Sequence, residues 1–242
     1  MSDDQYIAGW HALQAALDAG VQPHEVWADT RRRGRGEDLL ARLKRAGVPV
    51  HAADRRELDR LAPGVRHQGV VARVPPVKLA DESLLRQPAP AGGLLLALDG
   101  VQDPHNLGAV LRSAEAAGVQ AVIIPRDRSV SVNATVRKVS VGSADRVPVI
   151  EVANLARALA DLQQAGYWSV GLDGSATQSL YDTDLRVPTV LVMGSEGEGL
   201  RRLSREACDS LVRIPMQGQV ESLNVSVATA VCLYEAVRQR IA

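Results

Sequence analysis

The sequence predicts an α/β protein in two parts, a small mixed domain followed by a larger domain built on a parallel sheet. From residue 94 onward, near-continuous apolar runs of strand length alternate with segments of helical periodicity, which is typical of a parallel sheet covered by helices on both faces. The preceding stretch, PPVKLADESLLRQPAPAGG, is rich in proline and ends in a glycine pair, as linkers do. We therefore expect a first domain over residues 1–74, a linker over 75–93 and a second domain over 94–242.

The first domain begins with the segment GWHALQAALDAG. Its Trp10, Leu13 and Leu17 lie at helical spacing, and Gly20 ends the helix. The segment EDLLARLKRAG predicts a second helix, and VPVHAA and GVVARV predict strands. These patterns indicate a small α/β domain.

The second domain follows a regular alternation. The expected strands are LLLALD, VQAVIIP, YWSVGLD, TVLVMG and SLVRIP, and the expected helices are NLGAVLRSAEAAG, NLARALADLQQAG and NVSVATAVCLYEAVRQR. The last helix is apolar nearly all round, so we expect it to be buried. Ligands of such sheets bind beyond the carboxyl ends of the strands, which makes the loops after the strands the places to look for a site.

Composition and charge exclude several classes of protein. The chain is 46% apolar and 23% charged with zero formal net charge, as expected of a globular protein. Its start, MSDDQYIAGW, lacks the basic and apolar regions of a signal peptide, and no apolar run is long enough to span a bilayer. Cys208 and Cys232 come without a CxxC pattern or a histidine pair. We expect a cytoplasmic protein that binds neither a metal nor a membrane.

Positive charge is concentrated in one stretch, RRRGRGEDLLARLKR, over residues 31–45. It holds seven basic residues against two acidic ones, and Arg31, Arg32, Arg33 and Arg35 open it. From these residues alone, a solvated loop leading into a helix face and a contact with RNA are equally good explanations.

The first candidate loop joins a strand to a helix in LALDGVQDPHNLGAVLRSAEAAG. Pro104 and Gly108 shape its turn. Asn106 stands where a helix cap is expected, and Arg112 lies beside the apolar stripe of the helix. The alternative is purely structural, with Asn106 as a cap and Arg112 paired with Glu115.

The second candidate loop is GSEGEGL, residues 194–200. Its glycines fit neither phosphate-binding pattern, since the lysine of G-x-x-x-x-G-K-[ST] is missing and the spacing of G-x-G-x-x-G is not met. Glu196 and Glu198, with no nearby cation before Arg201, would repel a triphosphate. The loop suits a neutral or positively charged ligand that the backbone can approach closely, or it is simply a tight turn with solvated glutamates.

The third candidate loop lies in RIPMQGQVESLNVSVATAV. Ser222 and Asn224 are both good cap residues for the apolar helix that follows, so capping alone would explain them. A buried helix start with two polar residues and no cation also suits one edge of a small-ligand site.

In this order, the three loops resemble the motifs of the SpoU family, also called TrmH, of RNA ribose 2′-O-methyltransferases. Asn106, Gly108, Arg112 and Glu115 match the first motif, LVMGSEGEGL matches the second, and IPMQGQVESLNVSVATAV matches the third. The segments IAGWHALQAAL and HQGVVARV are similar to the substrate-binding domain of a subgroup that acts on ribosomal RNA. That domain resembles ribosomal protein L30e in fold, and the resemblance covers nearly the whole chain.

The resemblance implies a SPOUT methyltransferase domain with a deep trefoil knot, preceded by a small L30e-like α/β domain. It also implies a homodimer formed by the knotted domains. The implied methyl donor is S-adenosyl-L-methionine, which carries a sulfonium cation and no phosphate and so suits the acidic glycine loop. The residues that the resemblance implies as cofactor contacts are Met193, Gly194, Ile214, Leu223 and Asn224.

The catalytic residues implied by the resemblance are Asn106, Arg112, Glu196, Ser222 and Asn224. The family's proposed base matches Arg112, but arginine hardly ever loses its proton, so we expect Arg112 to fix an RNA phosphate or to stabilise the nascent alkoxide. Asn106 would orient the first loop and the ribose. Glu196 would hold Arg112 or its own loop in place, and Ser222 and Asn224 would shape the third loop.

The implied function is methylation of the ribose 2′-hydroxyl of a guanosine in large-subunit (23S) ribosomal RNA. In this context an RNA contact becomes the favoured explanation for the arginines at 31–35. Two alternatives remain, the same reaction on transfer RNA and a non-catalytic RNA-binding or ribosome-assembly factor. The N-terminal domain favours ribosomal RNA, since the tRNA enzymes of the family typically lack it, and the complete set of motif residues favours an enzyme.

Overall fold

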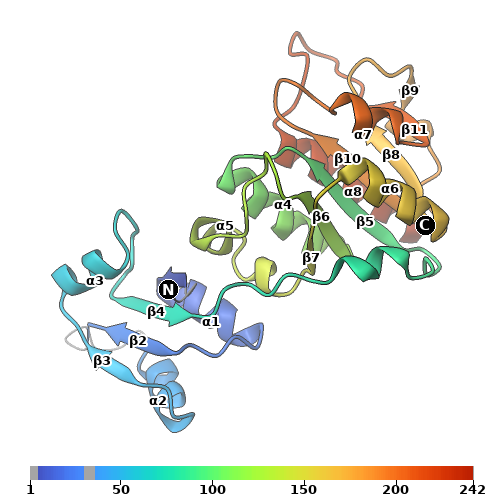
Figure 1. The fold of residues 1–242 in the computed structure, drawn as a ribbon. Coiled ribbons are helices and arrows are strands. Elements are labelled where there is room, and N and C mark those ends of the chain that lie inside the picture. Colours follow the sequence, from blue (N-terminus) through green and yellow to red (C-terminus); the bar gives the residue numbers. More distant parts are fainter. Residues whose placement is uncertain (1–4, 30–35, 242) are drawn as a thin grey trace. The chain divides into compact units, whose positions relative to one another are not determined.

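The computed structural model describes residues 5–29 and 36–241 (Figure 1). The contacts divide the chain into two compact units. The first unit contains the residues up to Val77 together with Val132–Arg146, and the second contains Lys78–Ser131 and Val147–Ala242. The division differs from the expected boundaries at two places: Val132–Arg146 joins the first unit, and residues 78–93 of the expected linker join the second.

The first unit is built on a four-stranded sheet with the order β1-β4-β2-β3. β4 runs antiparallel to β1 and β2, and β3 runs parallel to β2. Helices α1 and α2 contribute Leu13 and Leu43 to the core on one face, and α3 contributes Leu58 to the core on the other. The bounds are β1 (Gln5–Ala8), α1 (Trp10–Asp18), β2 (Glu25–Ala28), α2 (Glu37–Arg45), β3 (Val50–Ala52), α3 (Arg55–Leu61) and β4 (Val70–Val74).

A segment from much later in the chain completes the first unit. It forms α5 (Ala134–Val139) and a short 3₁₀ helix, η2 (Ser143–Asp145). Arg137, only 3% exposed, donates to both carboxylate oxygens of Asp145, at 2.9 and 2.5 Å, and to the backbone oxygen of Pro75 at 2.8 Å. Gln5 donates from its side chain to the backbone oxygen of Val132 at 2.9 Å. The segment is therefore held by hydrogen bonds to Gln5 and Pro75, near the two ends of the N-terminal part of the first unit.

The second unit contains a seven-stranded sheet with the order β7-β6-β5-β10-β8-β11-β9. All of its strand pairs are parallel, as the sequence predicts. The strands are β5 (Leu94–Asp99), β6 (Ala121–Pro125), β7 (Val149–Val152), β8 (Trp168–Leu172), β9 (Gln178–Ser179), β10 (Thr189–Gly194) and β11 (Ser210–Arg213). The helices are η1 (Glu82–Arg86), α4 (Pro104–Ala116), α6 (Leu155–Gln164), η3 (Leu180–Asp182), α7 (Arg202–Glu206) and α8 (Val225–Ile241).

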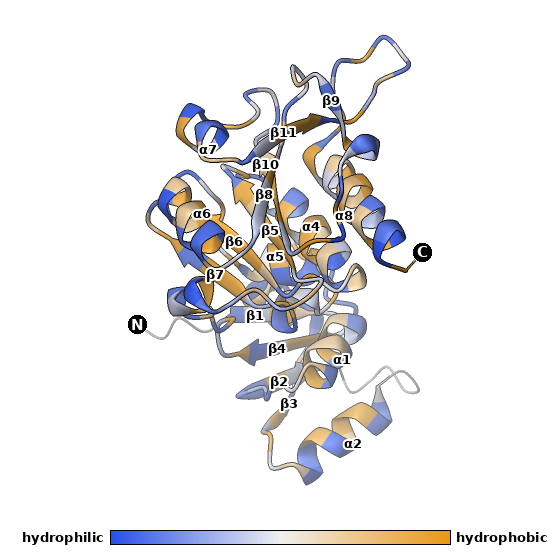
Figure 2. Ribbon diagram, turned by 90° about the vertical axis from the view of Figure 1, so that its right-hand side faces the viewer, coloured by the Kyte–Doolittle hydropathy of each residue, from blue (hydrophilic) through white to orange (hydrophobic). Residues whose placement is uncertain are grey.

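Helices cover both faces of this sheet. Leu95 and Ala97 of β5 pack in one cluster with Leu155 and Leu159 of α6. The alternate residues of β5 point to the opposite face, where α8 packs against α4 and β10. Figure 2 shows the sheet between α6 on one side and α4 and α8 on the other, with strands that are mostly hydrophobic. The expected two-sided covering is confirmed.

Most of the expected linker packs within the second unit. The backbone amide of Ala80 donates to the carbonyl of Val149 at 2.8 Å, and Leu85 of η1 is only 1% exposed. Leu85 belongs to the same apolar cluster as α6. This part of the chain is therefore a structural component of the second unit.

The last helix, α8, is not buried all round. Val225, Cys232 and Leu233 face the core, but Val227 and Tyr234 are 50% and 52% exposed. The prediction of a fully buried helix is therefore wrong for one face. An apolar sequence alone does not distinguish a face that packs on the chain's own core from one that remains uncovered.

Candidate active site

Three loops meet at the carboxyl end of the parallel sheet, after β5, β10 and β11. The carboxylate of Glu196, after β10, accepts hydrogen bonds from the amide nitrogens of Asn224 at 2.5 Å and Asn106 at 3.4 Å. The Asn224 amide also donates to the side-chain oxygen of Asn106 at 3.0 Å. Residues predicted from three separate motifs are thus in direct contact.

Asn224 also begins α8. Its side-chain oxygen accepts from the backbone amide of Ser226 at 3.0 Å and from the Ser226 hydroxyl at 2.6 Å, which is the geometry of a helix cap. Asn224 therefore caps α8 through its side-chain oxygen and contacts Glu196 and Asn106 through its side-chain nitrogen.

Asn106 does not cap α4, contrary to the expectation from the sequence. The helix begins at Pro104, and Asp103 is the cap, accepting from the backbone amide of His105 at 3.0 Å. A proline is well tolerated at the first helical position, so the helix starts three residues earlier than it would with Asn106 as its cap. Asn106 lies in the first turn, where its amide is directed to Glu196 instead.

Arg112 lies on α4 and is exposed. Within the part of the chain that the structure describes, its side chain forms no hydrogen bond or ion pair, so Glu196 holds the two asparagines and does not hold Arg112. The guanidinium group is therefore available to an external anion.

A cavity of about 350 Å³ opens beside these residues. Four of the five expected cofactor residues line it, and the fifth, Asn224, adjoins it through Leu223 and Val225. Glu196 and Ser222 of the expected catalytic set also lie in its wall. The lining residues from the expected sets are Met193, Gly194, Glu196, Ile214, Ser222 and Leu223.

The loop after β8 forms a wall that sequence reasoning missed. Leu172, at the end of β8, and Asp173 and Gly174 of the loop line the cavity, although no sequence motif singled out this loop. Its only signal was its position at the carboxyl end of an expected strand. Burial raises the pKa of Asp173, but hydrogen bonds from Ser175 and the charge of Arg205 outweigh it, so the net shift of the pKa is downward. Asp173 therefore stays ionised at neutral pH.

The cavity is acidic. Its wall carries the carboxylates of Asp173, Glu196, Glu198 and Glu221, and no lysine or arginine lies among its described lining residues. Apolar side chains such as Ile214 complete the surface. A ligand with a positive centre and an aromatic base fits this lining, and a phosphate does not.

The glycine loop is closed tightly on itself. Ser195 and Gly199 exchange backbone hydrogen bonds at 3.0 and 3.1 Å. A Cβ atom on Gly194 would lie 2.1 Å from the carbonyl carbon of Gly199, and Gly199 itself has a φ of +68°. Only glycine allows this approach, which places the backbone at the cavity wall.

The far end of the loop is anchored to β5. Asp99 is fully buried and accepts from the backbone amide of Arg201 at 2.8 Å and from its Nε at 2.5 Å. Sequence reasoning missed this pair, whose only local signal is a carboxylate at the end of the apolar run LLLALD.

Other predictions concern metals, membranes and RNA. No group of histidine, cysteine and acidic side chains suited to a metal ion occurs in residues 5–29 and 36–241. Over the same residues, no helix has both the length and the hydropathy needed to cross a membrane. Arg31, Arg32, Arg33 and Arg35 lie outside the described residues.

Comparison with known families decides the classification. Residues 93–234 match the model of the SpoU rRNA Methylase family, and residues 6–80 match that of RNA 2′-O ribose methyltransferase substrate binding. The chain belongs to the SpoU rRNA methylase family. The SpoU match contains all three of the loops that meet at the cavity.

Known proteins match along almost all of the chain. The chain is 53% identical to 23S rRNA (guanosine-2′-O-)-methyltransferase RlmB of Pseudomonas aeruginosa, over 99% of this chain and 98% of that protein. It is 54% identical to the protein of the same name from Bordetella pertussis, over 99% of both chains. The crystal structure of the SpoU methyltransferase AviRb from Streptomyces viridochromogenes, in complex with AdoMet, superposes with a TM-score of 0.80. That match covers 98% of this chain and 91% of AviRb at 28% identity.

Proposed function

We propose that this SpoU family protein transfers a methyl group from S-adenosylmethionine to the ribose 2′-oxygen of a guanosine in 23S ribosomal RNA. The observation that carries the proposal is the contact of Asn106, Glu196 and Asn224 beside an acidic, glycine-walled cavity. Similarity along the whole chain to enzymes of this activity supports the choice of substrate. Such a reaction takes place where ribosomes are assembled, so we place the protein in the cytoplasm.

The cavity fits S-adenosylmethionine. Backbone groups around Gly194, Ile214 and Leu223 would hold it, Met193 would pack against it, and the carboxylates of the wall favour its positive sulfur. When bound, this cofactor supplies an already activated methyl group. The protein therefore has to hold the ribose hydroxyl in line and assist the loss of its proton, and such positioning can contribute ~7–11 kcal/mol.

We assign to Arg112 the stabilisation of negative charge during the reaction. A guanidinium group keeps its proton at physiological pH, so it is a poor base but a good partner for a phosphate or an alkoxide. The absence of a partner for its exposed side chain within residues 5–29 and 36–241 supports this role. Asn106, fixed by Glu196 and Asn224, would orient the ribose, and Ser222 would shape the cavity edge.

Methyl transfer from labelled S-adenosylmethionine into unmodified 23S rRNA, followed by nucleoside mass spectrometry, tests the proposal. We expect 2′-O-methylguanosine from the wild type and none from Arg112→Ala, with unchanged cofactor affinity. Arg157→Ala, a change at an exposed arginine of α6, is the matched control and should act as the wild type. Near-normal turnover of Arg112→Ala would refute its role.

The same assay separates the rival functions. Incorporation into bulk tRNA but not into rRNA would keep the chemistry and reject the substrate. Cofactor binding without transfer to any RNA would favour a non-catalytic RNA-binding or assembly factor.

We assign RNA contact to Arg31, Arg32, Arg33 and Arg35 as well. The match of residues 6–80 to a substrate-binding family supports it. Replacing these arginines with glutamine should weaken RNA binding and lower its dependence on salt, because fewer counterions are released. An unchanged salt slope would show that they do not touch the RNA.

The finer features of the fold are also proposals. We assign a trefoil knot to the second unit and an L30e-like fold to the first. One cavity is lined both by residues 194–199 and by residues between 214 and 223. The C-terminal segment therefore lies close to the loop after β10, which supports the knot. An experimental structure with a continuous trace through this region tests the crossing.

We propose that two copies associate through α8. Val227, Tyr234 and Ile241 are spaced seven residues apart and are 50%, 52% and 79% exposed, so they form an apolar stripe along one side of the helix. The double substitution Val227→Asp and Tyr234→Asp should convert a dimer to a monomer in analytical ultracentrifugation. A monomeric wild type would contradict the assignment.

A further inference from the structure

A second cavity, of about 520 Å³, lies in the second unit and has no part in the mechanism described above. It opens at the carboxyl ends of β6 and β7 and at the beginnings of α6 and α7. Its wall holds three arginines, Arg128, Arg201 and Arg202. We call it the arginine cavity.

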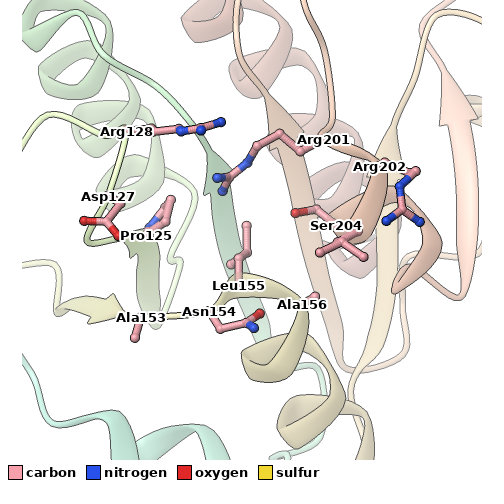
Figure 3. A pocket seen from close by; sticks show the side chains of 11 residues that line it. Pro125, Asp127, Arg128, Ala153, Asn154, Leu155, Ala156, Arg201, Arg202 and Ser204 are labelled. Carbon is pink, nitrogen blue, oxygen red and sulfur yellow. The ribbon is translucent and has the colours of Figure 1, made fainter.

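The side chains of the arginine cavity are arranged around an open centre. Figure 3 shows the guanidinium groups of Arg128 and Arg201 directed toward each other across the cavity, while Asp127 points away from them. Leu155, only 3% exposed, lies between the two sides, and Leu203, 56% exposed, adds an apolar surface to the wall. The centre therefore faces two cations and one hydrophobic surface.

The three arginines differ in how far their charges are already satisfied. Arg202 is paired with Glu206 at 2.9 Å, and Arg201 is held by the buried Asp99. The side chain of Arg128 is exposed and forms no ion pair or hydrogen bond with the residues that the structure describes. Its backbone φ of 60° lies in the left-handed region, which residues other than glycine rarely adopt. Arg128 thus presents an unpaired charge, and Arg201 presents a guanidinium group fixed in position.

The first turn of α6 adds to the positive character. Ala153, Asn154, Leu155 and Ala156 line the cavity at the start of this ten-residue helix, whose first amides have no partner within the helix. Only the amide of Arg157 is satisfied locally, by the side chain of Asn154 at 3.1 Å. A helix start of this kind favours an anion, in the same direction as the two guanidinium groups.

The arginine cavity adjoins the methyl-transfer site. Residues 194–199 line the cofactor cavity, and residues 201–204, which continue the same segment, line the arginine cavity. Gly100 lies close to both cavities. A Cβ atom added to it would be 3.8 Å from the backbone oxygen of Arg128, in the arginine cavity, and 3.8 Å from the Cβ of Ser195, in the cofactor cavity. A chain that occupies the arginine cavity therefore passes next to the catalytic loop.

We propose that the arginine cavity binds a phosphodiester of the RNA substrate, together with its nucleoside, next to the nucleotide that is methylated; this rests on the proposed function. Guanidinium groups match the geometry of phosphate oxygens, and the exposed side chain of Leu203 offers an apolar surface to a base. A cavity of this volume accommodates more than a bare phosphate.

The test compares two arginines that lie two positions apart. Arg128→Gln removes the unpaired charge from the cavity, and Arg126→Gln removes an equal, exposed charge that does not line it. RNA binding is measured over a series of salt concentrations, with KM and kcat for methyl transfer. For Arg128→Gln we expect an affinity about threefold to tenfold lower and a salt slope reduced by about one, with unchanged cofactor affinity and thermal stability.

Further variants and a nucleotide-binding measurement distinguish a wrong cavity assignment from a wrong proposed function. Arg128→Lys should retain the salt slope and lose part of the affinity, because it keeps the charge without the fork geometry. Equal effects of Arg128→Gln and Arg126→Gln in an active enzyme would overturn the cavity assignment alone, whereas an inactive wild type would overturn the proposed function. Binding of guanosine monophosphate that needs Arg128, without any change in RNA affinity, would assign the cavity to a free nucleotide and reject the RNA.

Discussion

Asn224 connects the start of α8 to the proposed catalytic site through the two ends of one amide. Its oxygen accepts from Ser226, and its nitrogen donates to Glu196 and Asn106. The capping half needs only an acceptor, whereas the catalytic half needs a donor. The two roles can therefore be separated by substitution.

Asn224→Asp should keep the cap and lose the donor. A second carboxylate would then face Glu196, and loss of a hydrogen bond to a charged group costs about 1.5–3 kcal/mol, toward the lower end for exposed side chains such as these. We expect methyl transfer about tenfold slower with nearly unchanged thermal stability. Asn224→Ala should lose the same donor, with a comparable loss of activity, and also about 0.5–2 kcal/mol of stability because the cap is gone. Wild-type turnover of the aspartate variant would contradict this division.

The two cysteines are held as neutral thiols. Burial raises the pKa of Cys208 to about 12, with help from the charges of Asp209 and Asp99, and burial alone raises the pKa of Cys232 to about 12. The unfolded thiols ionise near their ordinary pKa of 9.0. Rising pH therefore favours the unfolded chain between about 9 and 12, by about 1.4 kcal/mol per pH unit for each thiol.

Alkylation tests this directly. At pH 8 the native protein should resist iodoacetamide, and the denatured protein should react at both thiols. In urea unfolding, Cys232→Ala should show a weaker loss of stability above pH 9 than the wild type, because one of the two raised pKa values is gone. Rapid alkylation of the native chain would show that the thiols are accessible.

At the scale of elements, the glycine loop after β10 depends on a close backbone approach. A methyl group on Gly194 would collide with the backbone of Gly199, at 2.1 Å, and neither partner is a flexible side chain. A methyl group on Gly218, in the third loop, meets nothing within 4 Å. These two positions form a matched pair.

Gly194→Ala should reshape the loop and weaken S-adenosylmethionine binding by about tenfold or more. Overpacking of this kind costs about 1–3 kcal/mol. Gly218→Ala should bind the cofactor as the wild type does, by isothermal titration calorimetry. Equal affinities of the two variants for the cofactor would mean that the loop can change its conformation without weakening cofactor binding.

The sequence predicted the elements whose pattern is local. The strands of the second sheet are continuous apolar runs, and the three site loops carry recognisable motifs, so both could be found. The Asp99–Arg201 pair could not, because its partners are 102 residues apart and neither has a local pattern. The loop with Asp173 carried no motif, and α5 is too short to show a helical period.

At the scale of the whole molecule, the chain crosses between its two units three times, after residues 77, 131 and 146. The expected boundaries had a single crossing, since sequence position alone would assign Val132–Arg146 to the second domain. The contacts of this segment place it in the first unit instead. Arg137 pairs with the buried Asp145 and donates a hydrogen bond to the backbone of Pro75. Neither unit is therefore a separable piece of sequence.

Arg137→Ala should therefore destabilise the first unit, although Arg137 lies inside the SpoU match. Breaking a buried ion pair leaves Asp145, 4% exposed, without its partner and costs about 3–5 kcal/mol. Hydrogen exchange measured by mass spectrometry should accelerate in β1 and β4 and stay slow in β5 and β10. Lys138→Ala, on the same helix, is the control. Faster exchange confined to β5 and β10 would contradict the grouping.

The hydrogen bonds that join Asn106, Glu196 and Asn224 span 90, 28 and 118 positions of sequence. Contacts so distant along a chain are slow to form, because the entropy of closing long loops is lost before they can stabilise anything. During refolding, secondary structure and much of the core can therefore appear while these side chains are still apart. Methyl transfer should return last, so that a newly synthesised chain becomes an enzyme only when α8 is in place.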